Sequence, residues 1–211
     1  EYTITIADTL DTLHYIISAI DSSGNWNNTG TKDVSILDND APSLDADNSD
    51  TSGTTGDIFH FNISASDNIA VASVNATWSH GSLNGNLALT KTGNYWTGTI
   101  ILDHSISNLL YRIQVNDTSG NYIRGAQKSI PVSDNDDPEI TDNTPSSATT
   151  GDPFTFNASI TDNIAVSNVY VEYWYGSGSH TNVSMSNVAG NYWEYTITIA
   201  DTLDTLHYII S

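Results

Sequence analysis

Hydrophobic and polar residues alternate with a period of two along much of the central part of this sequence. Apolar residues alternate with polar ones in 59–65, and the same alternation recurs in 74–78 and 109–115. A period of two places successive side chains on opposite faces of a β-strand, one face buried and the other wet. Turn residues such as Asn84-Gly85 interrupt the pattern at short intervals, and no segment has convincing helical periodicity. We therefore predict an all-β chain of antiparallel strands.

The chain contains two nested repeats. Residues 1–18 are identical to residues 194–211, so the sequence returns to its own start after 193 positions. Within this period the motifs TTGD, DNIAV, GNYW and DND-x-P each recur after 95 to 97 positions. Repeats of fixed length are the signature of structural units arranged in tandem. We predict two sister domains that alternate along the chain.

One sister domain is complete in this sequence and two others are represented by halves. We place the C-terminal half of one domain at 1–41, a complete domain at 42–133, and a linker with the N-terminal half of the next domain at 134–211. Many short strands separated by turns are typical of an antiparallel sandwich. We therefore predict tandem seven-stranded immunoglobulin-like β-sandwiches in a linear array. Each half leaves a sheet edge and half a core uncovered, so we expect neither half to be stable alone.

Several segments resemble the tandem immunoglobulin-like repeats of bacterial and archaeal surface proteins. They are SDNIAVASVNATW at 66–78, GNYWTGTI at 93–100, LLYRIQVNDTSGNYI at 109–123 and DNDDP at 134–138. Tyr111, like its repeat counterparts Tyr15 and Tyr208, resembles the strand-F tyrosine of such sandwiches. The resemblance covers nearly the whole chain and implies a structural role at an extracellular cell surface.

The composition is strongly acidic, and aspartate supplies most of the acid. The chain has 25 acidic and 5 basic residues, and 21 of the acidic residues are Asp. A net charge of -20 argues against nucleic acid and anionic membranes as partners, because both attract Lys and Arg. Asp suits turns, where it bonds backbone N–H groups, and it also suits cation sites built from oxygen ligands. The acidity therefore favours cations or neutral partners.

Aspartates recur at the point where the chain enters the complete domain. If the strands reverse direction in order, the B–C and F–G turns meet the entering linker at one pole. This places linker residues Asp38 and Asp40 beside Asp67 and Asp117. Neighbouring carboxylates repel one another unless a cation neutralises them, and Ca²⁺ prefers such oxygen ligands. We expect one structural Ca²⁺ at each junction, where it would stiffen a flexible joint.

The sister junction carries a matching set of aspartates. The set consists of Asp134, Asp136, Asp137 and Asp162, together with the repeat counterpart of Asp21, which falls beyond Ser211, so we expect this second site to be incomplete. The linkers LDNDAP and SDNDDP also resemble the calcium-binding linkers of cadherins, although the order of Asp and Asn differs and the partner motifs of cadherins are missing. The other interpretation is that these aspartates only form turns.

Two further groups are candidates for modification and contact. Six Asn-x-Ser/Thr sequons are candidates for N-glycosylation: Asn27, Asn62, Asn75, Asn116, Asn157 and Asn182. Outward Asn is also what any polar strand face supplies. Tyr170 and Trp174 face outward if Val171 faces the core, and such aromatics pack against a neighbouring chain or stack on sugar rings. We favour lateral packing.

The sequence gives no support for catalytic chemistry. It contains no Cys, which excludes disulfides and thiolate metal sites. No His pair has zinc-ligand spacing, and neither a nucleophile elbow nor a phosphate-binding Gly loop is present. No apolar run approaches the roughly 20 residues of a membrane helix. We do not expect an enzyme.

We therefore expect a structural repeat of an extracellular fibre, stalk or surface-layer protein whose partners are other copies of the repeat, end to end and side by side. The alternative is a carbohydrate-binding or adhesin module of a secreted protein, with glycans as partners. The halves fit either a continuous polypeptide or successive subunits that complete each other. Because residues 1–18 and 194–211 would compete for the same strand positions, we favour the continuous polypeptide.

Overall fold

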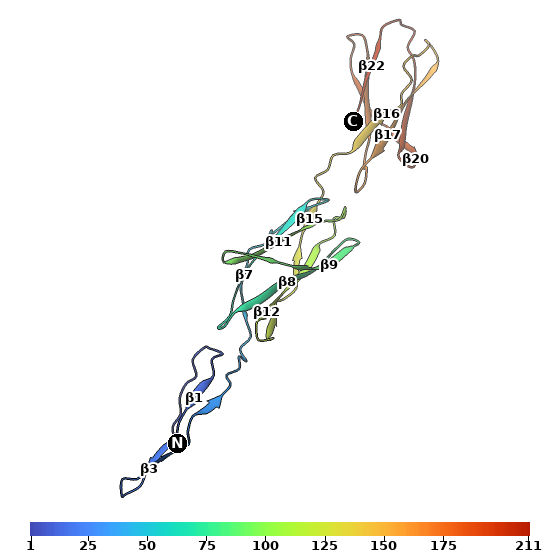
Figure 1. Cartoon of the computed structure of the whole chain (residues 1–211). Helices are drawn as coiled ribbons and strands as arrows, with labels where there is room; N and C mark the ends of the chain where they lie inside the picture. The colour runs from blue at the N-terminus through green and yellow to red at the C-terminus, as the bar shows by residue number, and fades with distance from the viewer. The chain divides into compact units, whose positions relative to one another are not determined.

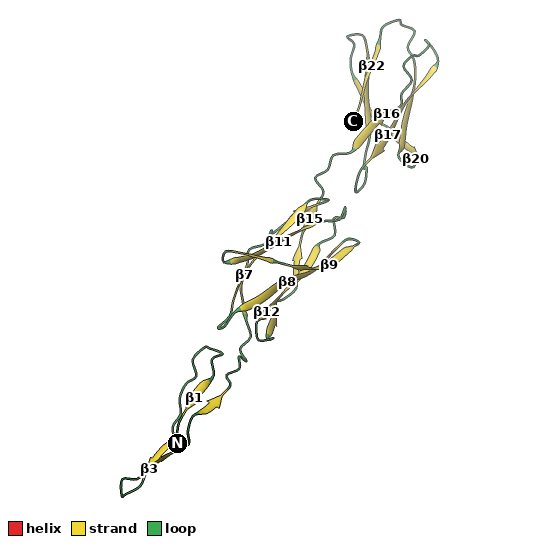
Figure 2. Ribbon diagram, in the orientation of Figure 1, coloured by secondary structure: helices red, strands yellow, loops and turns green.

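The computed structural model describes all of residues 1–211 and consists of strands, turns and loops (Figure 1). Figure 2 shows strands throughout the chain, which confirms the predicted all-β class. No helix reaches the length and apolarity needed to cross a membrane. Contacts divide the chain into unit 1, Glu1–Ser133, and unit 2, Asp134–Ser211.

The larger part of unit 1 is a sandwich of two β-sheets. Its strands are β5 Ser43–Asp47, β6 Gly53–Thr54, β7 Ile58–Ser66, β8 Val71–His80, β9 Leu83–Ala88, β10 Thr90–Thr92, β11 Tyr95–Ile101, β12 Leu109–Asp117, β13 Tyr122–Arg124, β14 Lys128–Ile130 and β15 Val132–Ser133. One sheet has the order β10–β11–β7–β5, and the other has the order β13–β12–β8–β9 with β14 also paired to β12. Neighbours within both sheets are antiparallel, whereas β15 pairs with β6 in parallel.

The period-two pattern places the core between these two sheets. Alternate residues of β7 and β12 are buried, and the residues between them are more exposed. Phe61 packs edge-to-face on Phe59 and on Tyr111, with ring centroids 5.2 Å apart in both pairs. None of the three is more than 2% exposed. Because burying apolar surface is worth about 25 cal/mol per Å², this aromatic cluster is a principal source of stability.

The sandwich has more strand segments than the seven predicted, partly because its last strand is broken into β13, β14 and β15. Pro131 separates β14 from β15, since proline has no N–H to donate to a ladder. Gly125, between β13 and β14, lies so close to Leu44 that a Cβ would approach Leu44 Cδ2 to 2.8 Å. After the second break, Val132 and Ser133 turn to pair with β6.

The N-terminal part of unit 1 is a hairpin of short strands. Strand β1 (Leu13–Tyr15) pairs with β4 (Lys32–Val34), and β2 (Ser18–Ile20) pairs with β3 (Trp26–Asn28). By repeat alignment this hairpin corresponds to β12, β13 and β14 of the sandwich. Its apolar side chains are far more exposed than those of the sandwich: Ile17 is 61% exposed and Trp26 is 70% exposed.

Unit 2 has two sheets, and the last strand of the chain lies at the edge of the second sheet. The strands are β16 Glu139–Asp142, β17 Pro153–Thr161, β18 Tyr170–Tyr175, β19 Thr181–Ser184, β20 Ser186–Ala189, β21 Tyr192–Thr198 and β22 Leu206–Ile210. The sheets have the orders β16–β17–β21–β20 and β19–β18–β22, so β22 is an edge strand. Phe154 and Phe156 pack edge-to-face at 5.3 Å, as Phe59 and Phe61 do in unit 1.

An equivalent backbone N–H group in the two sandwiches donates its hydrogen bond to a different side chain in each. In unit 1 the N–H of Asp103 donates to Nδ1 of His80, a residue only 1% exposed, at 2.9 Å. In unit 2 the corresponding N–H of Ala200 donates to the hydroxyl of Tyr175 at 3.1 Å. The sister domains therefore differ in the side chain that accepts this hydrogen bond but keep the bond itself.

Candidate metal centre

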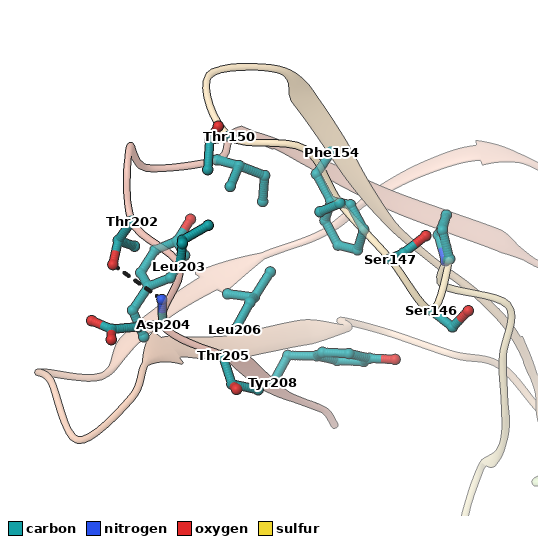
Figure 3. A pocket seen from close by; sticks show the side chains of 14 residues that line it. Ser146, Ser147, Thr150, Phe154, Thr202, Leu203, Asp204, Thr205, Leu206 and Tyr208 are labelled. Atoms are coloured by element: carbon teal, nitrogen blue, oxygen red, sulfur yellow. Dashed lines mark hydrogen bonds between the residues drawn. The ribbon is translucent and has the colours of Figure 1, made fainter.

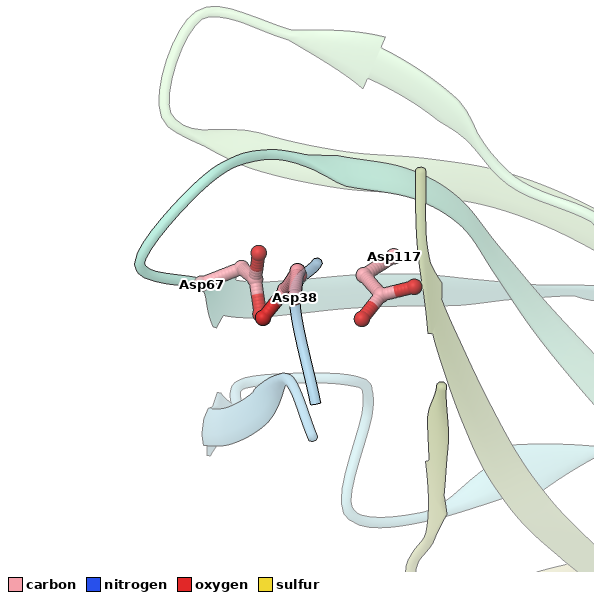
Figure 4. Close-up of side chains that lie close together, drawn as sticks. All are labelled: Asp38, Asp67 and Asp117. Carbon is pink, nitrogen blue, oxygen red and sulfur yellow. The ribbon is translucent and has the colours of Figure 1, made fainter. Parts of the chain in front are cut away.

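Three aspartates that we predicted to share a cation site lie together at one end of the sandwich of unit 1. One carboxylate oxygen from each of Asp38, Asp67 and Asp117 lies within 4.8 Å of the other two (Figure 4). Asp38 lies in the linker before β5, Asp67 in the turn after β7, and Asp117 at the end of β12. The antiparallel arrangement of the strands brings these three positions to the same pole.

Backbone N–H groups orient all three carboxylates. Asp38 Oδ1 accepts a hydrogen bond from the N–H group of Asp40 at 3.1 Å. Asp67 Oδ2 accepts hydrogen bonds from the N–H groups of Ile69 at 3.0 Å and Ala70 at 2.9 Å. Asp117 Oδ1 accepts from the N–H groups of Ser119 at 2.9 Å and Asn121 at 2.8 Å. These are the local bonds that favour Asp in turns. Turn formation therefore accounts for one oxygen of each residue. Asp117 Oδ2 accepts a further hydrogen bond from Asn121 Nδ2, whereas the second oxygens of Asp38 and Asp67 accept none.

Two carboxylate oxygens in this cluster have no hydrogen-bond donor. Asp38 Oδ2 and Asp67 Oδ1 are both buried and make no hydrogen bond. Asp117 is only 4% exposed. A buried charged oxygen without a donor is costly, and a cation would remove that cost. Because all the candidate ligand atoms are hard carboxylate oxygens, the residues fit Ca²⁺.

The hydrogen bonds also favour the ionised form of Asp117. Burial alone raises the pKa of this carboxyl group, but the hydrogen bonds from the side chain and backbone of Asn121 and the backbone of Ser119 outweigh burial. The pKa of Asp117 is consequently lowered from its ordinary value. The site therefore carries negative charge at neutral pH, as a cation site requires.

Two asparagines at this site were not predicted. Asn121 Nδ2 donates to Asp117 Oδ2 at 2.8 Å and lies 3.4 Å from the backbone oxygen of Asp38. Asn68 Nδ2 lies 3.3 Å from Asp40 Oδ2 and 3.5 Å from Asp38 Oδ1. Their signal in the sequence is their place in the repeated motifs DNIAV and D-x-S-G-N. Asp40 is exposed and does not belong to the three-carboxylate group.

The predicted sister residues in unit 2 repeat the turn geometry of the site. Asp162 Oδ1 accepts hydrogen bonds from two backbone N–H groups at 2.7 and 2.8 Å, as Asp67 does. Asn163 Nδ2 donates to Asp136 Oδ2 at 2.7 Å, and the N–H of Asp136 donates to Asp134 Oδ1 at 3.3 Å. Asp137 is exposed. These residues do not form a three-carboxylate group.

Asp21 of unit 1 has the same hydrogen bonds as Asp117. Its Oδ1 accepts from the N–H groups of Ser23 and Asn25, both at 2.9 Å, and its Oδ2 accepts from Asn25 Nδ2 at 2.9 Å. The side-chain and backbone bonds from Asn25 lower the pKa of Asp21. The F–G turn of the sister domain is therefore preorganised in the same way as that of the complete domain.

The six sequons differ in exposure. Asn27 and Asn182 are exposed, whereas four are half-buried on strands: Asn62, Asn75, Asn116 and Asn157. Asn157 Nδ2 donates to Glu194 Oε1 at 2.6 Å, and Asn116 Nδ2 donates to Ser73 Oγ at 3.0 Å. Since N-glycosylation modifies the side-chain amide, the two exposed sequons are the more accessible.

Trp174 is covered by two histidines, whereas Tyr170 is open to solvent. The Trp174 ring stacks on His180 with centroids 4.0 Å apart and planes 5° apart, and it also stacks on His207 at 5.4 Å. Tyr170 is 41% exposed. The imidazoles occupy aromatic surface that a sugar ring or a neighbouring chain would need. Of the two predicted contact residues, Tyr170 offers the freer surface.

Of the comparisons with known proteins, only the search of solved structures found chains similar to this one. A scan of protein-family models found no match, and a search of curated proteins found none. Among solved structures, a marsupial T cell receptor is similar with 10% identity and a TM-score of 0.40, over 80% of this chain and 66% of that one. A tetra-tandem repeat in the extending region of a large adhesion protein has 16% identity and a TM-score of 0.38, over 95% and 55%. Fibronectin(III)-like modules of Clostridium thermocellum CbhA have 12% identity and a TM-score of 0.33, over 80% and 84%. These identities are too low to carry a function to this chain.

Proposed function

We propose that this chain is a structural repeat of an extracellular fibre, stalk or surface-layer protein, and that Ca²⁺ bound by Asp38, Asp67 and Asp117 holds its linker against the sandwich. The observation that carries the proposal is the meeting of three carboxylates from three separate segments. Two of these segments are turns of the sandwich, and the third is the linker that enters it. A cation shared by all three would restrict the linker relative to the domain.

The electrostatics support a structural role for the cation. Three carboxylates whose oxygens lie within 4.8 Å of one another repel when all are ionised. In the absence of a cation this repulsion favours separation of the linker from the turns. With a divalent cation the same charges become attractive ligands, and the joint stiffens. The linker would thereby respond to the calcium concentration outside the cell.

Thermal unfolding with calcium and with EDTA tests the proposal. A ligand that binds only the folded state at a concentration 100 times its Kd stabilises a protein by about 2.7 kcal/mol. We expect the melting temperature to rise with CaCl2 and to fall with EDTA, and small-angle scattering to show a more extended chain with calcium. The same melting temperature and the same scattering profile under both conditions would contradict the proposal.

The extracellular and structural parts of the proposal rest on the fold, the repeat and the charge. Tandem sandwiches joined by short linkers form extended repetitive chains, and the strongly acidic composition suits cations or neutral partners. The partners we propose are other copies of the repeat, end to end and side by side. We assign no catalytic chemistry to the chain.

Glycan binding is a second candidate function, favoured by a groove over β8 and β12. The groove has a volume of about 390 Å³, and its lining includes Trp78, Leu110, Arg112, Gln114 and Arg124. Two of the five basic residues of the chain therefore line one groove. An aromatic ring beside guanidinium groups suits an acidic sugar. A glycan array separates the two functions, because a purely structural repeat would bind no glycan and Arg124→Ala would change nothing.

A further inference from the structure

The outward face of one sheet of the complete sandwich is basic, although the chain as a whole is strongly acidic. Arg112 of β12 and Arg124 of β13 lie on this face, beside the groove over β8 and β12. The strands of this sheet are β8, β9, β12, β13 and β14, and their only acidic residue, Asp117, is 4% exposed. Two of the five basic residues of a chain with a net charge of -20 therefore face solvent with no exposed acid of the sheet beside them.

Neither arginine is neutralised within the chain. Arg112 is exposed and forms no hydrogen bond, ion pair or ring contact. Arg124 donates from Nε and Nη2 to Gln114 Oε1 at 3.2 and 2.7 Å, and this neutral acceptor holds the guanidinium group while its charge stays uncompensated. A guanidinium group presents its donors in a planar fork that matches a carboxylate. The face is therefore suited to bind a carboxylate of a partner.

The equivalent sheet of unit 2 carries the opposite charge. The cross-strand pair Thr77–Arg112 of unit 1 corresponds to the pair Glu172–Ile209 of unit 2. Strands β18, β19 and β22 contain Glu172 as their only acidic residue and have neither Lys nor Arg. Unit 2 as a whole contains eleven acidic residues and no Lys or Arg. The same face is therefore basic in the complete domain and acidic in its sister.

Glu172 lies on the side of its sheet that faces away from the core. Figure 3 shows Leu206 and Tyr208 of β22 facing a common space with the core residue Phe154. Alternate residues of a strand face opposite sides, so Ile209, which is 53% exposed, faces outward. Glu172 lies directly opposite Ile209 on β18 and therefore shares this outward face.

Glu172 retains one carboxylate oxygen for a partner, and an exposed tyrosine lies near it. Its Oε1 lies 2.7 Å from His180 Nδ1, whereas its Oε2 forms no hydrogen bond, and its side chain is 36% exposed. Tyr170, two residues away on the same face of β18, is 41% exposed. Guanidinium groups pair with carboxylates and also stack on aromatic rings. Glu172 and Tyr170 therefore offer both kinds of contact that Arg112 and Arg124 can make.

We infer that the face carrying Arg112 and Arg124 binds the face of unit 2 carrying Tyr170 and Glu172 in a second copy of this chain. The contact rests on the side-by-side assembly proposed above and gives that assembly its residues. Two like faces would place arginine against arginine or glutamate against glutamate, which is unfavourable, so each sister domain selects the other. Chains that lie side by side would therefore align unlike domains. Because a single exposed ion pair is weak, the repetition of the contact along an array would supply its strength.

Charge reversal in the full 211-residue chain, made without glycosylation, tests this contact by sedimentation. We expect R112E and E172R each to raise the dissociation constant for self-association about fivefold or more, because a like charge replaces an opposite one. Each variant keeps the face that the other lacks, so an equimolar mixture of the two should associate more strongly than either variant alone. A mixture that associates no better than the separate variants would overturn the inference.

Matched controls separate the contact from the net charge of the chain. K91E and E139R change the net charge as R112E and E172R do, at exposed residues on β10 and β16 of the other sheets. General repulsion between acidic chains predicts stronger association for E172R and E139R alike, whereas the proposed contact predicts weaker association for E172R. Association of E172R equal to that of E139R, or of R112E equal to that of K91E, would overturn the inference.

Two observations keep the test independent of folding. Arg112 has no partner within the chain, so R112E should melt at the same temperature as the unsubstituted chain. Glu172→Gln keeps an oxygen for His180 but removes the charge, and we expect it to weaken association less than E172R does. Unchanged association in Glu172→Gln and in R112E would overturn the inference whatever the stability of E172R.

The same variants distinguish a second copy from a glycan in the groove, with polygalacturonate as the acidic probe. Binding of polygalacturonate that R112E abolishes, together with normal self-association of R112E, would assign the groove to a glycan and overturn the inference. Loss of self-association in R112E and in E172R supports the contact between copies, because a glycan site on unit 1 does not require Glu172.

The contact is independent of the proposed cation site, because the groove contains none of Asp38, Asp67 and Asp117. R112E should therefore keep the response of the melting temperature to calcium. Normal association of R112E in a chain that calcium stabilises would overturn the lateral contact alone. Charge-dependent association in a chain indifferent to calcium would support the lateral contact and contradict the cation site.

Discussion

Tyr111 donates its hydroxyl hydrogen to Asp47 Oδ2 at 2.8 Å and so joins β12 of one sheet to β5 of the other. The Asp47 side chain is 8% exposed, and its Oδ2 also forms an ion pair with Lys128 Nζ at 2.8 Å. Unit 2 repeats the contact, with Tyr208 donating to Asp142 Oδ2 at 2.7 Å. A tyrosine that belongs to the core through its ring therefore holds an edge strand through its hydroxyl group.

The first prediction concerns this hydroxyl group. Tyr111→Phe keeps the ring in the core but removes one donor from a charged acceptor, and a hydrogen bond to a charged group is worth about 1.5–3 kcal/mol. We expect the free energy of unfolding, measured in urea, to fall by roughly 2 kcal/mol. Tyr15→Phe is the matched control because Tyr15 is 42% exposed. If the control loses as much stability as Tyr111→Phe, the hydrogen bond is not the cause.

The second prediction is loss of stability in acid. Burial raises the pKa of Asp47, but the hydrogen bonds from Lys128, Ser49 and Tyr111 outweigh burial and lower it from the ordinary value of 3.8. A carboxyl group with a lowered folded pKa contributes stability above its unfolded pKa and loses it as the pH falls through the folded value. We therefore expect stability to decline below about pH 4.

Asp47→Asn checks the origin of this acid response. The variant should be less stable at pH 7 and should lose less stability between pH 5 and pH 2 than the unsubstituted chain, as measured by urea titrations at each pH. Asp142 has the same relation to Tyr208, and the hydrogen bonds from Thr144 and Tyr208 lower its pKa against the effect of burial. An unchanged acid profile in Asp47→Asn would assign the response to other carboxyl groups.

The third prediction separates turn formation from cation binding. In Asp67→Asn the remaining carbonyl oxygen keeps the hydrogen bonds from Ile69 and Ala70, and the new amide replaces the oxygen that has no donor. We expect this variant to lose the rise in melting temperature with calcium and to be at least as stable as the unsubstituted chain in EDTA, because one repulsive charge is gone. Asp45→Asn, which removes an equal but exposed charge, should retain the response to calcium.

The meeting of three aspartates at one pole of the sandwich was predictable because it depends only on strand direction and chain order. Asp38, Asp67 and Asp117 come together wherever strands alternate in direction, whatever the details of side-chain packing. The sequence pattern likewise predicted the buried positions of β7 and β12. Both inferences rest on backbone periodicity, which a single sequence displays directly.

Contacts between distant side chains were not predictable in the same way. Tyr111 and Asp47 lie 64 positions apart, and Trp174 and His207 meet only because β18 and β22 are neighbours in one register. If the register of either strand shifted by one residue, the two side chains of the pair would lie on opposite faces of the sheet and would not meet. The close approach of Gly125 to Leu44, between β13 and β14, becomes visible only when the two sheets are packed together.

The fourth prediction concerns the sequons. Where the chain is made in a glycosylating host, we expect glycans at Asn27 and Asn182 in preference to Asn157, because the amide of Asn157 is held by Glu194 at 2.6 Å. Mass spectrometry of tryptic and chymotryptic peptides measures the occupancy of each sequon. Glu194→Ala should raise the occupancy of Asn157, and higher occupancy of Asn157 than of Asn182 in the unsubstituted chain would contradict the prediction.

The fifth prediction concerns lateral contact through Tyr170. We expect Tyr170→Ser to reduce side-by-side bundling without lowering the melting temperature by more than a few degrees, because the side chain is 41% exposed. Tyr192→Ser, at a tyrosine 51% exposed on the other sheet, is the matched control. Trp174→Ser should instead destabilise unit 2, since it removes the stacking with His180 and His207. Electron microscopy of bundles, read beside calorimetry, distinguishes the three variants.

The duplicated segment has a consequence for synthesis on the ribosome. Its two copies are 193 positions apart, and translation at 5–20 residues per second separates their emergence by roughly 10 to 40 s. A sandwich of this size folds within about a second or less. The residues of β7, β8 and β12 have therefore found their partners before the second copy leaves the exit tunnel. Alternation of two unlike sister domains thus keeps identical strands apart in time, so that a domain reaches its native pairing before the next copy of the same strand emerges.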